Sequence, residues 1–254
     1  MEIPLFPLHT VLAPGIAMPL HVFEERYRAL VRHCLDTSSP FGVVLIREGS
    51  EVAPAGGATL ELSIAGVGTV AEIREASRYA DGRWQLLVVG GDRFVVRAVH
   101  ADRAPYLVAE ADLLDDPPGN MAVAEALVGR VTRRFVEYLR LLQPRDGEAV
   151  EPIDVQVEVE VPDTEDAEPG AAGGGGPSEL AAALTIPDDP SRLSFLLTGV
   201  VQAEPDRKQA LLEAPTAAER LRELDRLLDR ELFLLARRLG PFAPARVSEP
   251  DRAN

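Results

Sequence analysis

The side chains that most often perform catalysis are sparse in this 254-residue sequence. Lys208 is the only lysine, and it lies between Arg207 and Gln209 on a segment that we expect to be an exposed helix. A solvated ammonium group stays protonated and is a poor general base, so a Ser-Lys dyad is not expected. A Walker-type ATP site is also excluded, because Gly-Lys-Ser and Gly-Lys-Thr never occur.

Cysteine and histidine do not form a recognisable site either. Cys34 is the only cysteine, which excludes an internal disulfide and a cysteine-rich zinc site. Its neighbour His33 points elsewhere on a helix, so we interpret the pair as a core cysteine beside a surface histidine. The four histidines lack a His-x-x-x-His pair. We therefore expect no enzymatic activity, no catalytic residue, no metal and no cofactor.

The formal net charge of −15 makes nucleic acid an improbable partner, because phosphate binding needs a broad positive surface. Nine acidic residues and no basic ones lie in 148–168, within an acidic and glycine-rich insertion at about 146–177, so the acidity is largely local. Valines and polar residues alternate over 153–161. This segment is either a solvated insertion or an extra strand that pairs with an exposed sheet edge and masks it.

Short apolar runs separated by glycines and prolines predict an all-β barrel or sandwich in the first part of the chain. The expected strands are 3–8, 41–46, 60–64, 69–73, 84–89, 93–99 and 106–111. Asp81-Gly82 is a typical hairpin turn. One helix interrupts the strands, and its apolar face is expected to contain Phe23, Tyr27, Leu30, Val31 and Cys34.

A helical pattern begins after Asp116-Pro117-Pro118-Gly119. Apolar residues at steps of three and four predict a helix over Met121–Leu142, and Asp189-Pro190 is a typical helix start. Further helices are expected at Pro205–Glu213 and from the capping box Thr216–Glu219 to Gly240-Pro241. We therefore expect a β-rich domain at 1–117, a helical domain at 118–242 and a tail at 243–254.

No membrane segment is expected, although residues 3–20 carry no formal charge. Four prolines prevent a continuous helix there, and Glu2 stands where a signal peptide is positive. We therefore expect a cytoplasmic protein.

Several motifs, in order along the chain, resemble the N-terminal, substrate-binding domain family of Lon protease. They begin with Ile3-Pro4-Leu5-Phe6-Pro7-Leu8, Pro14-Gly15, Leu20-His21-Val22-Phe23-Glu24 and Arg26-Tyr27. They continue with Gly68-Thr69-Val70, Gly91-Asp92-Arg93-Phe94, Asp189-Pro190-Ser191-Arg192-Leu193 and Lys208-Gln209-Ala210-Leu211-Leu212-Glu213. The resemblance implies an α+β fold, with an N-terminal PUA-like β-barrel that contains one inserted helix and a C-terminal helical bundle.

The same resemblance implies a bacterial, stand-alone form without the ATPase and peptidase domains. Pro14-Gly15 would turn the chain between two strands, Glu24 and Arg26 would fix the helix to neighbouring loops, and Gly68 would permit a close backbone approach. We interpret the motif residues as structural: Pro14, Gly15, His21, Phe23, Glu24, Arg26, Tyr27, Gly68, Arg93 and Phe94.

The leading functional hypothesis is a non-catalytic module that binds unfolded or apolar polypeptide segments, as an adaptor or regulator of proteolysis with a protease or chaperone as a further partner. Binding would use an apolar groove or a sheet edge. The alternative is an RNA-binding, PUA-like protein that uses a local patch of arginines, namely Arg74, Arg78, Arg83, Arg93 and Arg97.

Overall fold

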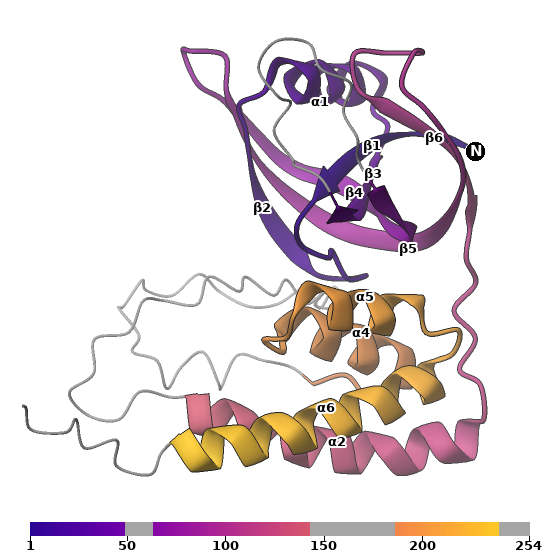
Figure 1. Ribbon diagram of the computed structural model, residues 1–254, viewed down its shortest axis with the longest axis vertical. Helices are drawn as coiled ribbons and strands as arrows, with labels where there is room; N and C mark the ends of the chain where they lie inside the picture. The colour runs from indigo at the N-terminus through magenta and orange to yellow at the C-terminus, as the bar shows by residue number, and fades with distance from the viewer. Residues whose placement is uncertain (49–62, 143–185, 239–254) are drawn as a thin grey trace, which may run out of the picture.

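The computed structural model describes residues 1–48, 63–142 and 186–238 (Figure 1). The first part of the chain contains six strands in one sheet of order β2-β5-β4-β3-β1-β6, with an additional β5–β6 pairing. Five strands therefore pair in a closed circuit. The sixth, β2, pairs with the first half of β5, on the edge that β6 occupies along the second half. The strands are β1 (Glu2–Leu8), β2 (Ala17–Val22), β3 (Phe41–Glu48), β4 (Ser63–Arg78), β5 (Trp84–His100) and β6 (Leu107–Leu113).

The helix in this part is α1 (Glu25–Thr37), which buries Tyr27, Leu30, Val31 and Cys34 as predicted. The ring of Tyr27 stacks on Phe6 of β1 with 4.3 Å between centroids. The placement of Phe23 on this apolar face was wrong, because Glu24 is the N-cap and Phe23 precedes the helix. Its side chain is 54% exposed.

The second part consists of α2 (Met121–Leu142), α4 (Pro190–Val200), α5 (Pro205–Glu213) and α6 (Ala217–Arg238). The long helices α2 and α6 pack along each other, while α4 and α5 lie between them and the sheet (Figure 1). The expected N-cap is confirmed, since Asp189 accepts a hydrogen bond from the amide of Arg192 at 2.8 Å. Thr216 likewise accepts one from the amide of Glu219 at 3.2 Å.

Two differences from the expected strands have a physical cause. The runs 84–89 and 93–99 form the single strand β5, and the run 69–73 with the described end of 60–64 forms the single strand β4. Each is continuous because β4 and β5 pair with each other over most of their length. The strand β2 was not expected, since prolines flank and interrupt it.

The insertion at about 146–177 and the helix stop at Gly240-Pro241 lie outside the described residues. Among the described helices, none is long and apolar enough to cross a lipid bilayer.

The core of the sheet depends on close approach at Gly68. A methyl group on Gly68 would lie 2.5 Å from the carbonyl oxygen of Val43 and 2.6 Å from the ring of Phe94. Phe94 is fully buried, and its ring occupies the space that a side chain on Gly68 would need. The two motif residues are thus in contact. They lie 26 positions apart in the chain, so the sequence alone did not predict this contact.

We expect Gly68→Ala to lower the free energy of unfolding by about 2 kcal/mol, because β3 and the ring of Phe94 would have to move. Gly66→Ala is the matched control on the same strand, since nothing lies within 4 Å of an added methyl there. Urea unfolding of both variants measures the difference. Equal stability of the two variants would contradict the close approach.

Candidate functional site

The tip of the β4–β5 hairpin holds one part of the candidate site. The amide of Tyr79 donates to the carbonyl oxygen of Arg83 at 2.9 Å, and the amide of Gly82 donates to that of Tyr79 at 3.0 Å. Gly82 has φ +85°, which favours glycine, and Asp81 accepts a hydrogen bond from the amide of Arg83. The expected Asp81-Gly82 turn is confirmed, and it holds the ring of Tyr79 at the surface.

Three rings meet where this hairpin lies beside the end of β2. The ring of His21 lies 6.4 Å from that of Phe23 and 6.0 Å from that of Tyr79. Phe23 and Tyr79 are 54% and 47% exposed. We call His21, Phe23 and Tyr79 the aromatic edge. Large apolar rings that remain in water are poised to bury their surface against a ligand.

Polar neighbours fix the orientation of the aromatic edge. Nδ1 of His21 lies 3.3 Å from Oε1 of Gln85. Nε2 of the same histidine lies 3.4 Å from Nη1 of Arg83. The guanidinium group of Arg83 also lies 5.7 Å from the ring centroid of Tyr79 and pairs with Asp81 at 2.6 Å. These contacts orient the rings of His21 and Tyr79, and Phe23 lies against the ring of His21.

The strand β2 has an open edge beside these rings. Within the described residues β2 pairs with β5 on one side only. The amide of Gly90 donates to the carbonyl of Ile16, so alternate residues from Ile16 onwards face β5 and the intervening ones, including Pro19 and His21, face outwards. Proline has no amide hydrogen, so Pro19 leaves the open edge with a missing donor.

The motif residues divide into groups with different surroundings. Pro14 and Gly15 lie in the turn between β1 and β2, and Glu24 pairs with Arg26 at 3.0 Å. His21 and Phe23 belong to the aromatic edge. Tyr27 is buried between α1 and β1, and Gly68 and Phe94 are buried within the sheet. The role of Glu24 and Arg26 in fixing α1 to neighbouring loops stays a prediction.

Arg93 is buried where the sheet meets the helices. Its side chain is 3% exposed and donates to the carbonyl oxygens of Leu212 at 2.7 Å and Ala214 at 2.9 Å. It also donates to the carbonyl oxygen of Asp115 and to Oδ1 of Asp116. One side chain of β5 therefore binds both the segment after β6 and the end of α5.

Arg220 of α6 meets the same carboxylate from the opposite side. Its side chain is fully buried, and Nη2 donates to Oδ1 of Asp116 at 2.7 Å while Nε donates to Oγ of Ser194 at 2.7 Å. The ring of Phe195 lies 3.6 Å from its guanidinium carbon. Burial lowers the pKa of Arg220 and Arg93, and Asp116 opposes this effect. We call Arg93, Asp116, Phe195 and Arg220 the arginine hub.

The segment between the sheet and the helices is bound to the start of α6. The amides of Ala217 and Ala218 donate to the carbonyl oxygens of Pro117 and Pro118 at 3.2 and 3.1 Å. These bonds satisfy amides that the first turn of a helix leaves without intrahelical partners. Nε2 of Gln209 also donates to the carbonyl of Val67 on β4. The helices are thus fixed to the sheet by polar contacts as well as by packing.

Sequence analysis did not identify Asp116 or Arg220 as important. The available signal was that Arg220 lies four residues before Leu224, on the apolar stripe of its helix. A charged residue at such a position needs a buried partner. The distant segment that supplies this partner was not identifiable from the pattern.

We expect Asp116→Asn to lower the free energy of unfolding by about 3 kcal/mol, because two buried guanidinium groups lose their shared carboxylate. Asp115→Asn is the matched control, since Asp115 is exposed and contacts Arg93 through its backbone oxygen. Chemical denaturation measures both variants. The arginine hub is not a stabilising contact if the two variants unfold at the same urea concentration.

The side chains that sequence analysis considered for catalysis, Lys208 and Cys34, are partly or fully buried. The expectation that Lys208 is exposed was wrong: it is partly buried, and Nζ donates to the carbonyl oxygen of Gly199 at 3.0 Å. Burial lowers its pKa. Cys34 is buried, and its pKa is raised to about 11 by burial. In the part of the chain that the structure describes, no cluster of three His, Cys, Asp or Glu residues is placed to hold a metal ion.

We expect Cys34 to react with a thiol reagent at pH 8 at least about a hundredfold more slowly than an exposed cysteine, because the buried thiol stays protonated. Asp36→Cys in a Cys34→Ser background supplies an exposed thiol on the same helix. Absorbance of the released chromophore measures both rates, and urea should equalise them. Fast modification of folded Cys34 would contradict its burial.

Comparison with known proteins places this architecture in a family. The profile of the ATP-dependent protease La (LON) substrate-binding domain matches residues 2–230. The chain therefore belongs to the Lon substrate-binding domain family. Membership supports a substrate-recognition module and not a catalytic domain.

The relatives are much longer than this chain. The Lon protease of Escherichia coli (strain K12) is 25% identical over 236 residues, which is 92% of this chain and 25% of the relative. Lon protease 2 of Myxococcus xanthus is 27% identical over 254 residues, which is 98% of this chain and 26% of the relative. The chain thus spans about a quarter of the length of these proteins.

Two solved structures share the fold. The N terminal domain of Mycobacterium avium complex Lon protease aligns with a TM-score of 0.60 and 18% identity. The Lon N-terminal domain protein from Xanthomonas campestris aligns with a TM-score of 0.50 and 22% identity. Each alignment covers 90% of this chain and 98% of the solved chain. The fold is therefore the mixed sheet-and-helix fold of Lon N-terminal domains.

Proposed function

We propose that the protein is a non-catalytic module that binds unfolded or apolar polypeptide segments at the aromatic edge and along β2. The observation that carries this proposal is the group of exposed rings beside an open strand edge. Membership in a substrate-binding family supports it.

The geometry favours weak binding with little sequence preference. An extended segment along β2 would receive hydrogen bonds from the outward backbone groups of His21, whereas Ala17 is only 7% exposed and Pro19 has no amide to donate. Because few backbone hydrogen bonds would form between β2 and the bound segment, they would contribute little to the affinity. The rings of Phe23 and Tyr79 would then supply most of the binding energy by burying apolar surface, which many different segments offer.

Several finer statements belong to the same proposal. The paired strands would form a PUA-like β-barrel and the helices a C-terminal bundle, with the boundary between domains at 117 and 118. A role as an adaptor or regulator of proteolysis, a protease or chaperone as partner, and a cytoplasmic location stay predictions. The closed circuit of strand pairings supports the barrel.

The RNA-binding alternative has less support. Arg93 of the suggested arginine patch is buried in the arginine hub and is not available to a phosphate. Three others each face a carboxylate: Arg74 with Glu72, Arg83 with Asp81 and Arg97 with Asp112. These carboxylates weaken the positive field that counterion release requires.

We expect the double variant Phe23→Ser, Tyr79→Ser to bind fluorescein-labelled casein, which is unfolded in buffer, at least about tenfold more weakly than the parent protein. The reason is the loss of two rings that bury apolar surface on binding. Fluorescence anisotropy measures the affinity. Leu113→Ser is the control, since Leu113 is also 54% exposed but lies at the far end of the sheet.

The proposal fails if the parent protein does not bind casein, or if Leu113→Ser weakens binding as much as the double variant. Circular dichroism and urea unfolding of each variant show that the fold is intact. Phe23, Tyr79 and Leu113 are all exposed, so shortening their side chains should change the free energy of unfolding little.

A further inference from the structure

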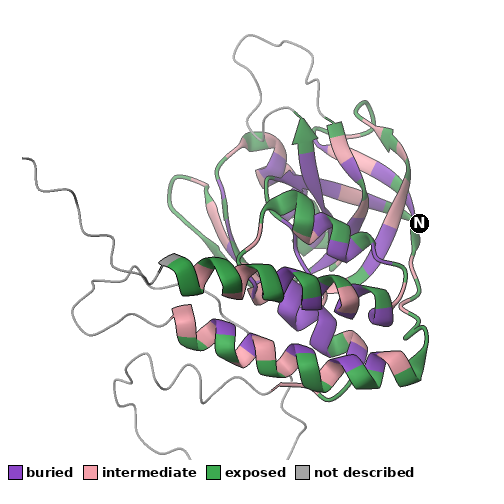
Figure 2. Cartoon of the chain, turned by 60° about the horizontal axis from the view of Figure 1, so that its bottom comes forward, coloured by how far each residue is buried: buried purple, intermediate pink, exposed green. Residues whose placement is uncertain are grey.

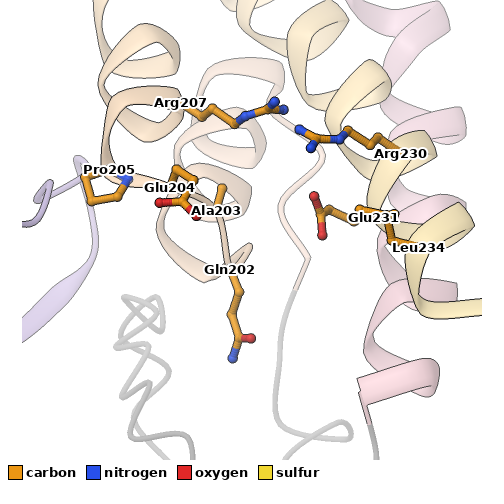
Figure 3. A pocket seen from close by; sticks show the side chains of 8 residues that line it. All are labelled: Gln202, Ala203, Glu204, Pro205, Arg207, Arg230, Glu231 and Leu234. Atoms are coloured by element: carbon orange, nitrogen blue, oxygen red, sulfur yellow. The ribbon is translucent and has the colours of Figure 1, made fainter. Parts of the chain in front are cut away.

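Two of the cavities on the surface of the described helices differ in charge. The first, of about 430 Å³, lies between the start of α5 and the second half of α6. Figure 3 shows the guanidinium groups of Arg207 and Arg230 pointing toward one another there, with Glu204 and Glu231 beside them. Two arginines and two glutamates balance, so this cavity has no preference for one sign of charge.

The second cavity, of about 510 Å³, runs between α2 and the first half of α6, and we call it the α2–α6 groove. One wall consists of small and apolar residues of α2, namely Ala122, Val123, Ala126 and Leu127. The two long helices pack side by side, and exposed residues follow their outward faces (Figure 2).

The charged residues of the α2–α6 groove are predominantly basic. Arg130, Arg222 and Arg226 line it, and Asp225 is the only carboxylate among its lining residues. Asp225 already pairs with Arg130 and also with Arg134, at 2.7 Å from the latter, and its side chain is 12% exposed. Arg226 in turn pairs with Glu223, which does not line the groove. Among the described residues, Arg222 is therefore the lining arginine without an ion pair, and the groove keeps a small excess of positive charge.

This local charge decides the attraction despite the net charge of −15. At physiological ionic strength the Debye length is about 8 Å, so charges far from the groove are screened. A ligand in the groove would meet Arg222 without a competing carboxylate among the described residues.

The walls also determine which backbone conformation fits. Beyond the first turn of α2, both walls are α-helical backbone whose amides and carbonyls are bonded within each helix. An extended segment in the groove would find no backbone partners, whereas a helix satisfies its own hydrogen bonds. The small side chains of Ala122 and Ala126, one turn apart, allow a helix to approach closely.

We propose that the α2–α6 groove binds an amphipathic helix of another polypeptide, with apolar residues against Ala122 and Ala126 and acidic residues against Arg222 and Arg226. The apolar wall selects the face of the helix, and the arginines select the acidic flank. This surface is separate from the aromatic edge and does not depend on the function proposed for it.

The probe is a designed peptide of about 15 residues with leucines on one face, glutamates on the flanks and a fluorescein label. We expect saturable binding to the full chain by fluorescence anisotropy, weakened about tenfold by Arg222→Glu because like charges would then face each other. Ala126→Trp should weaken binding similarly by filling the groove. Arg133→Glu is the matched control, because Arg133 is exposed on α2 and does not line the groove.

Four results with the peptide would overturn the proposal. They are the absence of binding, equal loss in Arg222→Glu and Arg133→Glu, unchanged affinity when lysines replace the glutamates of the peptide, and loss of binding in Phe23→Ser, Tyr79→Ser. The last result would place the peptide at the aromatic edge. Sedimentation of the chain alone tests a second copy as the occupant, and self-association that Arg222→Glu abolishes would also overturn the proposal.

Discussion

Two guanidinium groups share the carboxylate of Asp116 inside this protein, and the arrangement of the sheet and the helices depends on that contact. Arg93 belongs to β5 and Arg220 to α6, while Asp116 lies on the segment that connects the two parts. A buried charge without a partner is costly, so each of the three residues requires the other two. The ring of Phe195 and the carbonyls at the end of α5 complete the surroundings of the arginines.

The arginine hub joins the sheet to the helices, and the two proposed binding surfaces lie on either side of it. The aromatic edge is carried by β2 and the β4–β5 hairpin, whereas the α2–α6 groove lies on the helices farthest from the sheet (Figure 1). The layer formed by α4 and α5 separates them. If both proposed surfaces bind the same polypeptide, two weak contacts would hold it more firmly than either alone, provided that it reaches both.

Features governed by neighbours in the chain were predictable. The Asp189 cap, the turn at Asp81-Gly82 and the helix Met121–Leu142 each follow from residue types a few positions apart. The strand β2 was not predicted, because prolines argue against strands. It exists because Pro19 lies on an open edge, where its missing amide breaks no bond within the sheet. The helix boundary at Glu24 likewise decided that Phe23 is exposed.

The amino-acid sequence alone determined the family motifs, most helices and strands, and the absence of a Walker-type ATP motif. Only the tertiary structure decided which polar residues are buried. Arg93, Lys208 and Arg220 look alike in the sequence as surface cations, yet each lies where distant carbonyls or a carboxylate accept its hydrogen bonds. The reason is physical: the free energy of burying a charge depends on the partners that meet it, and here those partners come from remote segments of the chain.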